Sequence, residues 1–515
     1  MRKWQSHLEM AQLPLKIIFI AVIFNAIATL ILDSSISGAI SVFGNQWVVL
    51  VFNVIRTIAQ NIINNFPLLF LISFISRRYD SYVPIIGGVV GYITLHVVSM
   101  FVASRNIAGY YFSETLGIKY TIEQIINTTP STIYPIQFGI IGTILIIFIV
   151  RRVYHNSRVK AAHGFMSYVD RDTYAIVMIM LSSIVLGIVL SIAWIYVAQL
   201  NDFIYATIAS DISNPMNMFI YGVLDVVSTL LGFNNILYQN FWFTNLGGTW
   251  IDTFGTTFSG DVSMFTALSK NLIATSGAGR FITPYYLINL FAIPAYVIVS
   301  RQMFTNKKEK RKYFSFMIIA ILASWLGGTI LPFLLFLLFA APFMLLLHTG
   351  FTAVLFALMS GLSIFVGYSY SGSIINAVPG NIIDLIAQLL NGYNAMNIYK
   401  MLGVGVIVFI LYFIFTRYYY HKFAHVILGS NEELIDNIID SFGGIFNIET
   451  IDSTINKLVF TVKDKSKLNF EFLLDTHINK VVETMNGYEV NFGSDSYIVR
   501  QLILDFKMKA EYING

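Results

Sequence analysis

The chain has 515 residues, of which 56% are hydrophobic and only 12% are charged. Soluble domains contain roughly 45–50% apolar and about 25% charged residues, so the composition excludes a chain built only of soluble domains. The absence of cysteine excludes disulfides, thiolate metal ligands and a cysteine nucleophile. The net charge of +4 sums two unlike parts: residues 1–429 hold 24 Lys and Arg against 14 Asp and Glu, whereas residues 430–515 hold 8 against 14. This balance gives no indication of nucleic-acid binding.

Apolar runs that could span a membrane recur through the first 420 positions, since a spanning helix needs about 20 such residues. They lie at 15–32, 62–76 (short), 83–103, 134–150, 173–200, 217–237, 283–300, 314–347 (long enough for two passes or a kinked pair), 350–368 and 401–416. We therefore expect nine or ten spans, the first of them an uncleaved helix rather than a signal peptide. The Gly-rich, half-polar segments 244–280 and 369–399 favour re-entrant hairpins.

Basic clusters predict the orientation of these spans, because short loops rich in Lys and Arg stay in the cytoplasm. The clusters are Arg2/Lys3, Arg77/Arg78, Arg151 to Lys160, Arg301 to Lys312 and Arg417/Lys422. The segment after Lys422 follows one of them. We therefore expect the C-terminal part of the chain in the cytoplasm.

The C-terminal part reads as a small folded domain. A capping box at Ser430–Glu433 begins a helix that Gly443-Gly444 ends. Further elements are expected as strands at 445–450 and 455–463, a helix near 467–474, strands near 478–484 and 487–492, and a helix over 495–508. The predicted fold is thus an all-α polytopic membrane domain over residues 1–425, followed by a small cytoplasmic α+β domain over residues 426–515.

Polar residues within apolar runs are the candidate functional groups, because each is costly in a membrane unless it serves a path or a binding site. They are Asp225, Asn234, Asn235, Asn289, Asn376 and Asp384. Amides hydrogen-bond sugar hydroxyls and aromatic rings stack on sugar faces, so Trp242, within Phe241-Trp242-Phe243, points to a sugar site. The alternative is that these residues are interfacial aromatics and helix-packing amides. No metal or cofactor motif is present in the sequence.

Several passages resemble the membrane subunit of the bacterial sugar phosphotransferase system (PTS), in its glucose/maltose/N-acetylglucosamine group. That subunit has a IIC transport domain followed by a IIB domain. The passages cover nearly the whole chain in the family's order. They are Asn65–Phe70, Gly88–Tyr92, Phe219–Gly222, Gly232–Leu237, Phe241–Phe243, Gly260-Asp261, Ile293–Ala295, Leu326–Pro332, Ala341-Pro342, Tyr370–Gly372 and Asp452–Asp464.

The resemblance implies a protein-Nπ-phosphohistidine–sugar phosphotransferase, in which phosphate passes from a IIA domain to a IIB cysteine and then to sugar held in IIC. This chain departs from the family where that chemistry occurs. Thr454 stands at the phosphocysteine position, and a threonine hydroxyl does not ionise near neutral pH. In the membrane domain, family residues are replaced as follows: two glutamates by Leu331 and Leu334, paired histidines by Asn234 and Asn235, an aspartate by Asn376 and an arginine by Val226.

Three interpretations follow from the resemblance and its departures. The first is an active phosphotransferase permease, which the replaced residues disfavour. The second is a sugar permease-like protein that binds or translocates a hexose-type sugar without phosphotransfer. In this interpretation no catalytic residue is intact and the substrate ligands are Asn234, Asn235, Asn376, Asp225 and Trp242. The third is a non-transporting membrane sensor or scaffold whose acidic tail binds a cytosolic partner. The resemblance further implies a bacterial plasma membrane location, lipid contact, a homodimer, a IIA protein acting in trans and no nucleic-acid partner.

Overall fold

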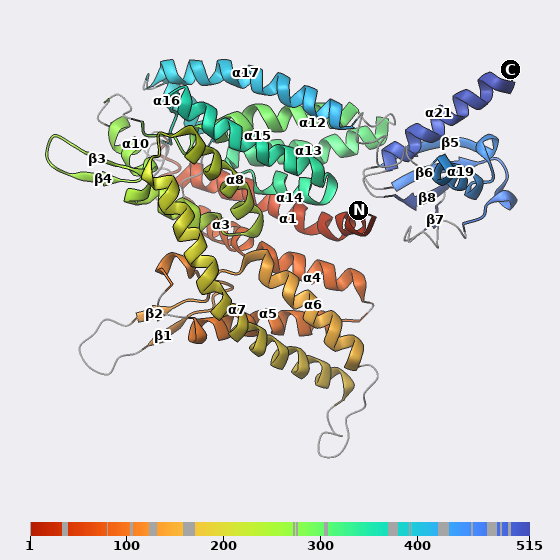
Figure 1. Ribbon diagram of the computed structural model, residues 1–515, viewed down its shortest axis with the longest axis horizontal. Coiled ribbons are helices and arrows are strands. Elements are labelled where there is room, and N and C mark those ends of the chain that lie inside the picture. Colours follow the sequence, from red (N-terminus) through yellow and green to blue (C-terminus); the bar gives the residue numbers. More distant parts are fainter. Residues whose placement is uncertain are drawn as a thin grey trace.

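The computed structural model is helical up to Tyr420 and forms a small mixed unit from Glu432 onward (Figure 1). It describes residues 2–32, 40–79, 81–103, 107–122, 131–157, 170–270, 273, 277–302, 307–368, 380–390, 392, 394–420, 432–454, 457–470, 481–484, 487–492 and 496–514. The predicted boundary between residues 425 and 426 lies outside these ranges. Two separate hydrophobic cores, one on each side of it, support the proposed division.

The helical body consists of long helices and two short hairpins. Its first half contains α1 (Arg2–Leu32), α3 (Gln46–Asn64), α4 (Phe66–Arg78), α5 (Val83–Val102), η1 (Gly109–Tyr111), the hairpin β1 (Tyr120–Ile122) and β2 (Ser131–Ile133), α6 (Gly139–Ser157) and α7 (Arg171–Ser210). The middle contains α8 (Pro215–Leu231), α9 (Asn234–Phe243), η3 (Asn245–Gly247), the hairpin β3 (Thr249–Ile251) and β4 (Thr257–Ser259), and α10 (Asp261–Lys270). The remainder contains α11 (Thr283–Leu287), the π-helical η4 (Ile288–Ala292), α12 (Ile293–Gln302), α13 (Lys307–Gly327), α14 (Leu331–Ala340), α15 (Pro342–Gly361), α16 (Ile382–Leu390) and α17 (Ala395–Tyr418).

Eight helices in the described part of the chain are long and apolar enough to cross a membrane, and three shorter apolar helices, at 215–231, 314–327 and 331–340, accompany them. The chain is therefore a multi-pass membrane protein. One of the eight, α3, is absent from the expected spans because its apolar residues are interrupted by Asn53, Arg56 and Gln60. The apolar run at 314–347 is divided among three helices: it covers the apolar part of α13, all of α14 and the start of α15, and its first two pieces, at 314–327 and 331–340, are the shorter apolar helices. Segment 244–280 contains the β3–β4 hairpin and α10, and most of 369–399 lies outside the described ranges.

The expected continuous span over 217–237 is wrong, because the helix breaks at Gly232. Gly232 has a φ of 83°, and the amide of Phe233 donates to Ser228 O at 2.7 Å, which closes the end of α8. The chain then turns into α9. Apolar residues continue through this break, so hydrophobicity alone does not reveal it.

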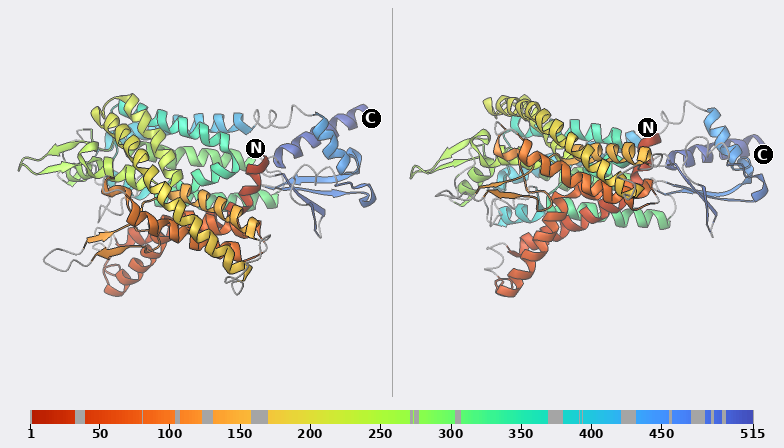
Figure 2. Two further views of the ribbon diagram at one scale, coloured as in Figure 1. Left: turned by 60° about the horizontal axis from the view of Figure 1, so that its bottom comes forward. Right: turned by 90° about the horizontal axis from the view of Figure 1, so that it is seen from below.

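Basic residues gather at one end of the body. Arg77/Arg78, Arg151/Arg152, Arg301 and Arg417 lie toward the C-terminal ends of α4, α6, α12 and α17. In Figure 1 these ends are on the right, where the C-terminal unit lies, and both β hairpins are at the opposite end. The views in Figure 2 agree with this arrangement. Basic charge and the C-terminal unit therefore share one side of the body.

The C-terminal unit is a four-stranded antiparallel sheet of order β5-β6-β8-β7 with two helices packed on it. Its elements are α19 (Glu432–Ser441), η7 (Ile445–Asn447), β5 (Ile448–Ser453), β6 (Lys457–Val462), η8 (Lys465–Lys467), β7 (Val481–Thr484), β8 (Gly487–Asn491) and α21 (Ser496–Asn514). The small α+β fold is confirmed. The first strand begins at Ile448 rather than 445, and residues 468–470 are not helical, whereas 471–474 lie outside the described ranges.

Prediction for the α6–α8 contact: Gly139→Ala destabilises the protein. Gly139 has a φ of 53°, and a Cβ there would lie 1.8 Å from Leu231 O. Strained backbone and overpacking each cost about 1–3 kcal/mol, so the melting temperature of detergent-solubilised protein should fall by several degrees. Gly403→Ala on α17 is the matched control, since nothing lies within 4 Å of its Cβ. Equal melting temperatures for both variants would contradict the close approach.

Candidate functional site

The break between α8 and α9 brings a group of polar and aromatic side chains together. On α8, Tyr221, Asp225 and Thr229 follow one another at i, i+4 and i+8, so they share one helix face. All three are buried, and the side chain of Asp225 has no exposed surface. The sequence candidate Asp225 thus lies inside the body rather than at its edge.

Helix α9 contributes two aromatic rings at i, i+4 spacing. The rings of Tyr238 and Trp242 are stacked with their centroids 3.9 Å apart and an interplanar angle of 8°. Both ring centroids lie 6.4 Å from the ring of Tyr285 on α11. The sequence candidate Trp242 is therefore brought to the same place as Asp225.

Tyr285 connects α11 to α8. Its hydroxyl donates a hydrogen bond to Asp225 Oδ1 at 2.5 Å and lies 3.3 Å from the hydroxyl of Tyr238. We name Tyr221, Asp225, Thr229, Tyr238, Trp242 and Tyr285 the Asp225 cluster. Only Asp225 and Trp242 of its members were expected from the sequence. The sequence could have indicated Tyr221, Thr229 and Tyr238 as well, because each lies four residues from Asp225 or Trp242 and so shares a helix face with it.

Four polar atoms of the Asp225 cluster are buried without a hydrogen bond of good geometry in the described part of the chain: Asp225 Oδ2, Tyr221 Oη, Thr229 Oγ1 and Trp242 Nε1. Their polar neighbours lie within the cluster itself, Tyr221 beside Trp242 and Thr229 beside Tyr238. A buried polar group left unpaired costs about 1–3 kcal/mol, and nearly all such groups in folded proteins are paired. The set combines a charge-bearing acceptor, a donor and two hydroxyls that can do either. Such a set suits a ligand that carries several hydroxyl groups.

The asparagines expected from the sequence as functional residues are not found among the side chains of the Asp225 cluster. Asn234 begins α9 and is half-buried, and Asn235 beside it is exposed, so the structure does not bring Asn235 into the Asp225 cluster. Asn289 is buried, and its Nδ2 donates to Gly328 O at 3.0 Å. Asn376 lies outside the described residues.

Asp384 is a second buried carboxyl, and its neighbours satisfy it. The hydroxyl of Tyr286, the residue after Tyr285, donates to Asp384 Oδ2, and Gln388 Nε2 donates to the same oxygen at 2.8 Å. Asn381 caps the backbone amide of Asp384 at 2.7 Å. Two consecutive tyrosines of α11 therefore donate hydrogen bonds to two different buried carboxyls, Tyr285 to Asp225 and Tyr286 to Asp384. The Asp384 carboxyl links α11 to α16 and has a structural role.

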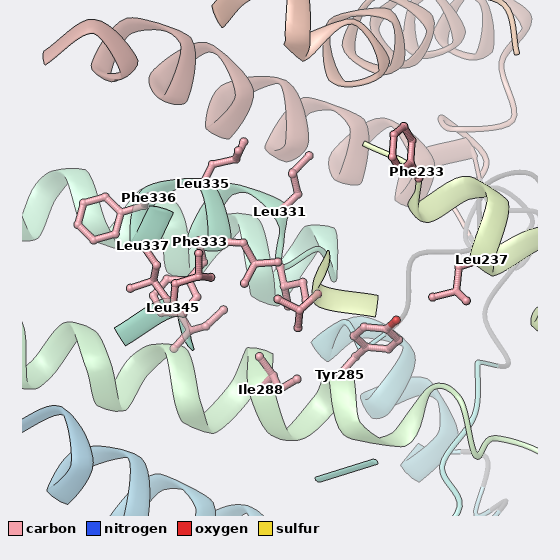
Figure 3. Close-up of a cluster of buried hydrophobic side chains, with 14 of the residues drawn as sticks. Phe233, Leu237, Tyr285, Ile288, Leu331, Phe333, Leu335, Phe336, Leu337 and Leu345 are labelled. Atoms are coloured by element: carbon pink, nitrogen blue, oxygen red, sulfur yellow. The ribbon is translucent and has the colours of Figure 1, made fainter. Parts of the chain in front are cut away.

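The two positions that the family resemblance assigns to glutamates are apolar in this chain. Leu331 and Leu334 lie on α14 and are 5% and 0% exposed. Figure 3 shows Leu331 in one buried hydrophobic cluster with Phe233, Leu237 and Tyr285. The wall beside Tyr285 thus offers no carboxylate from α14.

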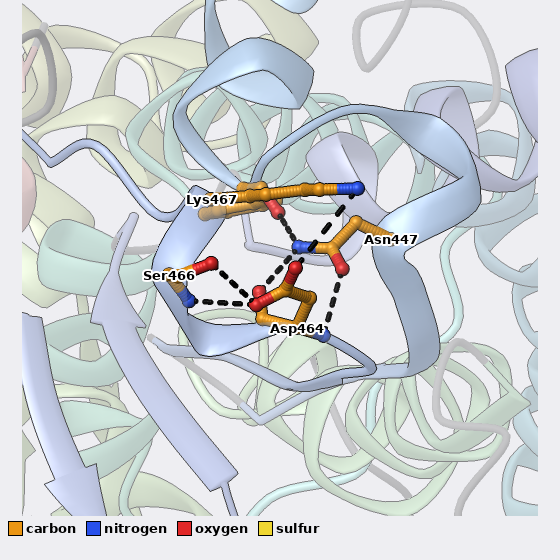
Figure 4. Close-up of polar contacts among 5 residues, drawn as sticks. Asn447, Asp464, Ser466 and Lys467 are labelled. Carbon is orange, nitrogen blue, oxygen red and sulfur yellow. Dashed lines mark hydrogen bonds and ion pairs between the residues drawn. The ribbon is translucent and has the colours of Figure 1, made fainter.

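Thr454 directly follows β5 and closes the turn into β6. Its Oγ1 accepts from the amide of Lys457 at 2.9 Å, and its backbone amide donates to Lys457 O at 2.7 Å. At the open end of the same hairpin, Asn447 is linked to Asp464, whose amide donates to Asn447 Oδ1 at 2.9 Å (Figure 4). Hydrogen bonds from Ser466 hold the pKa of Asp464 below its usual range. The threonine hydroxyl therefore has a structural task in the turn.

The sheet of the C-terminal unit is tied to α21 beside this turn. Arg500 Nε forms an ion pair with Asp452 Oδ1 at 3.4 Å, and the guanidinium is almost fully buried. Burial lowers the pKa of Arg500, and the charge of Asp452 opposes this shift. The ion pair fixes the strand that leads to Thr454.

Prediction for the two tyrosines: Tyr285→Phe destabilises the protein more than Tyr286→Phe. The first change removes the closest hydrogen bond to Asp225, whereas Asp384 and Gly367 O, the two acceptors of the Tyr286 hydroxyl, each keep a bond from Gln388. Leaving a buried acceptor unpaired costs about 1–3 kcal/mol, so the melting temperature in detergent should fall further for Tyr285→Phe. A larger fall in melting temperature for Tyr286→Phe than for Tyr285→Phe would show that the Tyr285–Asp225 hydrogen bond contributes less to stability than the bonds of Tyr286.

Comparison with known proteins agrees with the sequence motifs. No family model matches the chain. The chain is 24% identical over 389 residues, 72% of its length, to the PTS system glucose-specific EIICBA component of Staphylococcus carnosus, and it covers 55% of that relative. It is 24% identical over 488 residues, 90% of its length, to the PTS system glucoside-specific EIICBA component of the same organism, and it covers 68% of that relative. The chain thus spans between about half and two thirds of the relatives it matches. The resemblance is confirmed: the chain is a multi-pass membrane protein related to the PTS sugar permeases of the glucose group.

Proposed function

We propose that this protein binds and translocates a hexose-type sugar without phosphorylating it. The observation that carries the proposal is the Asp225 cluster, where four buried polar atoms without a hydrogen bond of good geometry adjoin the stacked rings of Tyr238 and Trp242. The names of the two relatives, glucose-specific and glucoside-specific, indicate the class of sugar.

A sugar satisfies both features of the cluster. Its hydroxyls can form hydrogen bonds with Asp225 Oδ2, accept from Trp242 Nε1 and exchange hydrogen bonds with Tyr221 and Thr229. Its apolar C–H face can pack against an aromatic ring, because a large ring offers a broad apolar face. Two of the ligands proposed from the sequence, Asp225 and Trp242, have contacts in the structure that support the assignment. The other three are proposed from the sequence alone: Asn234, Asn235 and Asn376.

Loss of phosphotransfer is supported independently in both parts of the chain. The Thr454 hydroxyl is bonded within its turn, and Leu331 and Leu334 place hydrocarbon where the family has carboxylates. A leucine can neither bind a sugar hydroxyl nor remove its proton. A single replacement would be a local variation, whereas replacements in both parts affect one shared reaction.

The arrangement of charge supports a cytoplasmic C-terminal unit. The basic helix ends and the C-terminal unit lie on one side of the body (Figure 1), and basic ends mark the cytoplasmic side. We propose further that the unit is the site where a IIA protein or another cytosolic protein docks, and that the membrane body forms a homodimer, as the family resemblance implies.

Prediction for transport: purified protein in proteoliposomes exchanges radiolabelled glucose or methyl glucoside in the absence of any phosphoryl donor. Exchange should saturate with sugar concentration, and Trp242→Ala should reduce it about tenfold, since it removes the stacked ring and a donor. Trp47→Ala is the matched control, because Trp47 is 75% exposed on α3. No saturable exchange of either sugar would contradict the proposal and favour the sensor or scaffold function.

Prediction for phosphotransfer: the protein accepts no phosphate from the general carrier proteins charged by phosphoenolpyruvate. The carriers' own label shows that phosphate is being supplied. Because a threonine ester is stable, any transfer to Thr454 would accumulate and be seen. A phosphoenolpyruvate-dependent label on the C-terminal unit that Thr454→Ala abolishes would overturn this prediction.

A further inference from the structure

Asp225 is a buried carboxyl without a cation. The four ion pairs found among the described residues all join residues between Asp452 and Arg500 in the C-terminal unit. Within the described membrane body, the hydrogen-bonding groups at the Asp225 carboxyl are neutral tyrosine hydroxyls: Tyr285 donates to Oδ1 at 2.5 Å and Tyr238 also approaches the carboxyl, while Oδ2 has no hydrogen bond of good geometry. Burying a charge without a partner is far more costly than burying a neutral polar group. Asp225 therefore needs a proton or a ligand to occupy Oδ2.

The groups that face Asp225 from the surrounding elements are all neutral or already engaged. Tyr221 is on its own helix, and Tyr238 and Tyr285 come from α9 and α11. Helix α15, which packs along α8, contributes Phe356 and carries one titratable side chain. This is His348, whose Nδ1 is bonded to Tyr412. Helix α14 contains no titratable residue.

The remaining neighbours of α8 and α9 carry charges that have other partners or lie at helix ends. Asp202 on α7 accepts from Tyr110 and Tyr111, and Asp261 on α10 accepts from three backbone amides of residues 279–281. The basic residues of α6 fall near its C-terminal end, at Arg151, Arg152 and His155. No described cation thus offsets a charge on Asp225.

We infer that Asp225 carries a proton together with the sugar, so that transport is coupled to a proton gradient. The inference rests on the proposed function of the same cluster. Oδ2 takes a proton from hydronium on the outer side, which leaves water, and the resulting carboxyl donates to a sugar hydroxyl. When the sugar leaves on the inner side, the O–H bond breaks and the proton passes to water. One proton crosses with each sugar, and no oxidant or phosphoryl donor is needed.

The hydroxyls of Tyr285 and Tyr238 support this role. The Tyr285 hydroxyl lies 2.5 Å from Asp225 Oδ1 and 3.3 Å from the Tyr238 hydroxyl, which forms a short chain of exchangeable protons beside the carboxyl. Ionisable groups inside membrane proteins commonly mark proton paths. Asp384 is the matched contrast: Tyr286 and Gln388 both donate to its Oδ2, and Asn381 caps its amide, so it is held as a structural group.

The test uses the full chain in proteoliposomes with radiolabelled glucose, a membrane potential clamped at zero and no sodium. A pH gradient of one unit, alkaline inside, should drive sugar accumulation up to about tenfold if one proton accompanies each sugar. A protonophore should return the sugar to equilibrium. A pH dye trapped in the lumen measures the protons that enter with the sugar, and the ratio of protons to sugar should be close to one.

The variants assign the proton to Asp225. Asp225→Asn should lower the ratio of protons to sugar from about one to near zero, whatever sugar flux it retains. Asp384→Asn should keep the ratio near one. Asp225→Glu keeps an ionisable carboxyl, so its ratio of protons to sugar should also stay near one. This variant is measured in place of Asp225→Asn if the latter carries too little sugar for a ratio to be determined.

The outcomes separate this inference from the proposed function. Saturable glucose exchange that neither the pH gradient nor the protonophore alters would overturn proton coupling and leave the sugar function standing. Accumulation driven by sodium alone would likewise overturn it. No saturable exchange of glucose at all would contradict both the proposed function and the coupling.

Discussion

The hydrogen bond between Tyr285 and Asp225 is the link on which the interior of the membrane body depends. It joins residues 60 positions apart in sequence and places α11 against α8. No ion pair is found among the described residues of the body, so buried hydrogen bonds such as this one make its polar links between helices. The break at Gly232 completes the arrangement, because it turns α9 so that Tyr238 and Trp242 meet Tyr285. The grouping of the buried polar atoms of the Asp225 cluster follows from these two features.

The scarcity of charged residues affects the packing of the body as well as its insertion into the membrane. Residues 313–383 contain no Asp, Glu, Lys or Arg, and α14 within that run is entirely apolar. Packing there comes from buried rings and leucines, as in Figure 3. In the C-terminal unit, the threonine at the phosphocysteine position closes a turn. The proposed loss of phosphotransfer accords with both observations, because residues that pack or brace the fold stand at the positions that the family resemblance assigns to that reaction.

Much of the fold was predictable because it depends on local patterns. Long apolar runs predict most spanning helices, and Gly443-Gly444 predicts the end of α19. The helix break at Gly232 was not predictable, because apolar residues continue on both sides and only the backbone conformation distinguishes it. Helix α3 was missed because its polar residues dilute the apolar run.

The site was predictable only in part, for a similar reason. Asp225 and Trp242 stand out as polar and aromatic residues in an apolar context, and the structure brings them together. Tyr285 could not be chosen among 29 tyrosines, because its role depends on a long-range contact. Asn235 matched a family motif by position, yet the start of α9 leaves it exposed. Equilibrium binding of glucose to the detergent-solubilised protein, measured by titration calorimetry without a phosphoryl donor, tests the central claim most directly. A sugar site at the Asp225 cluster predicts saturable binding that Asp225→Ala abolishes, whereas binding unchanged by that substitution, or no binding by the unmodified protein, would contradict it.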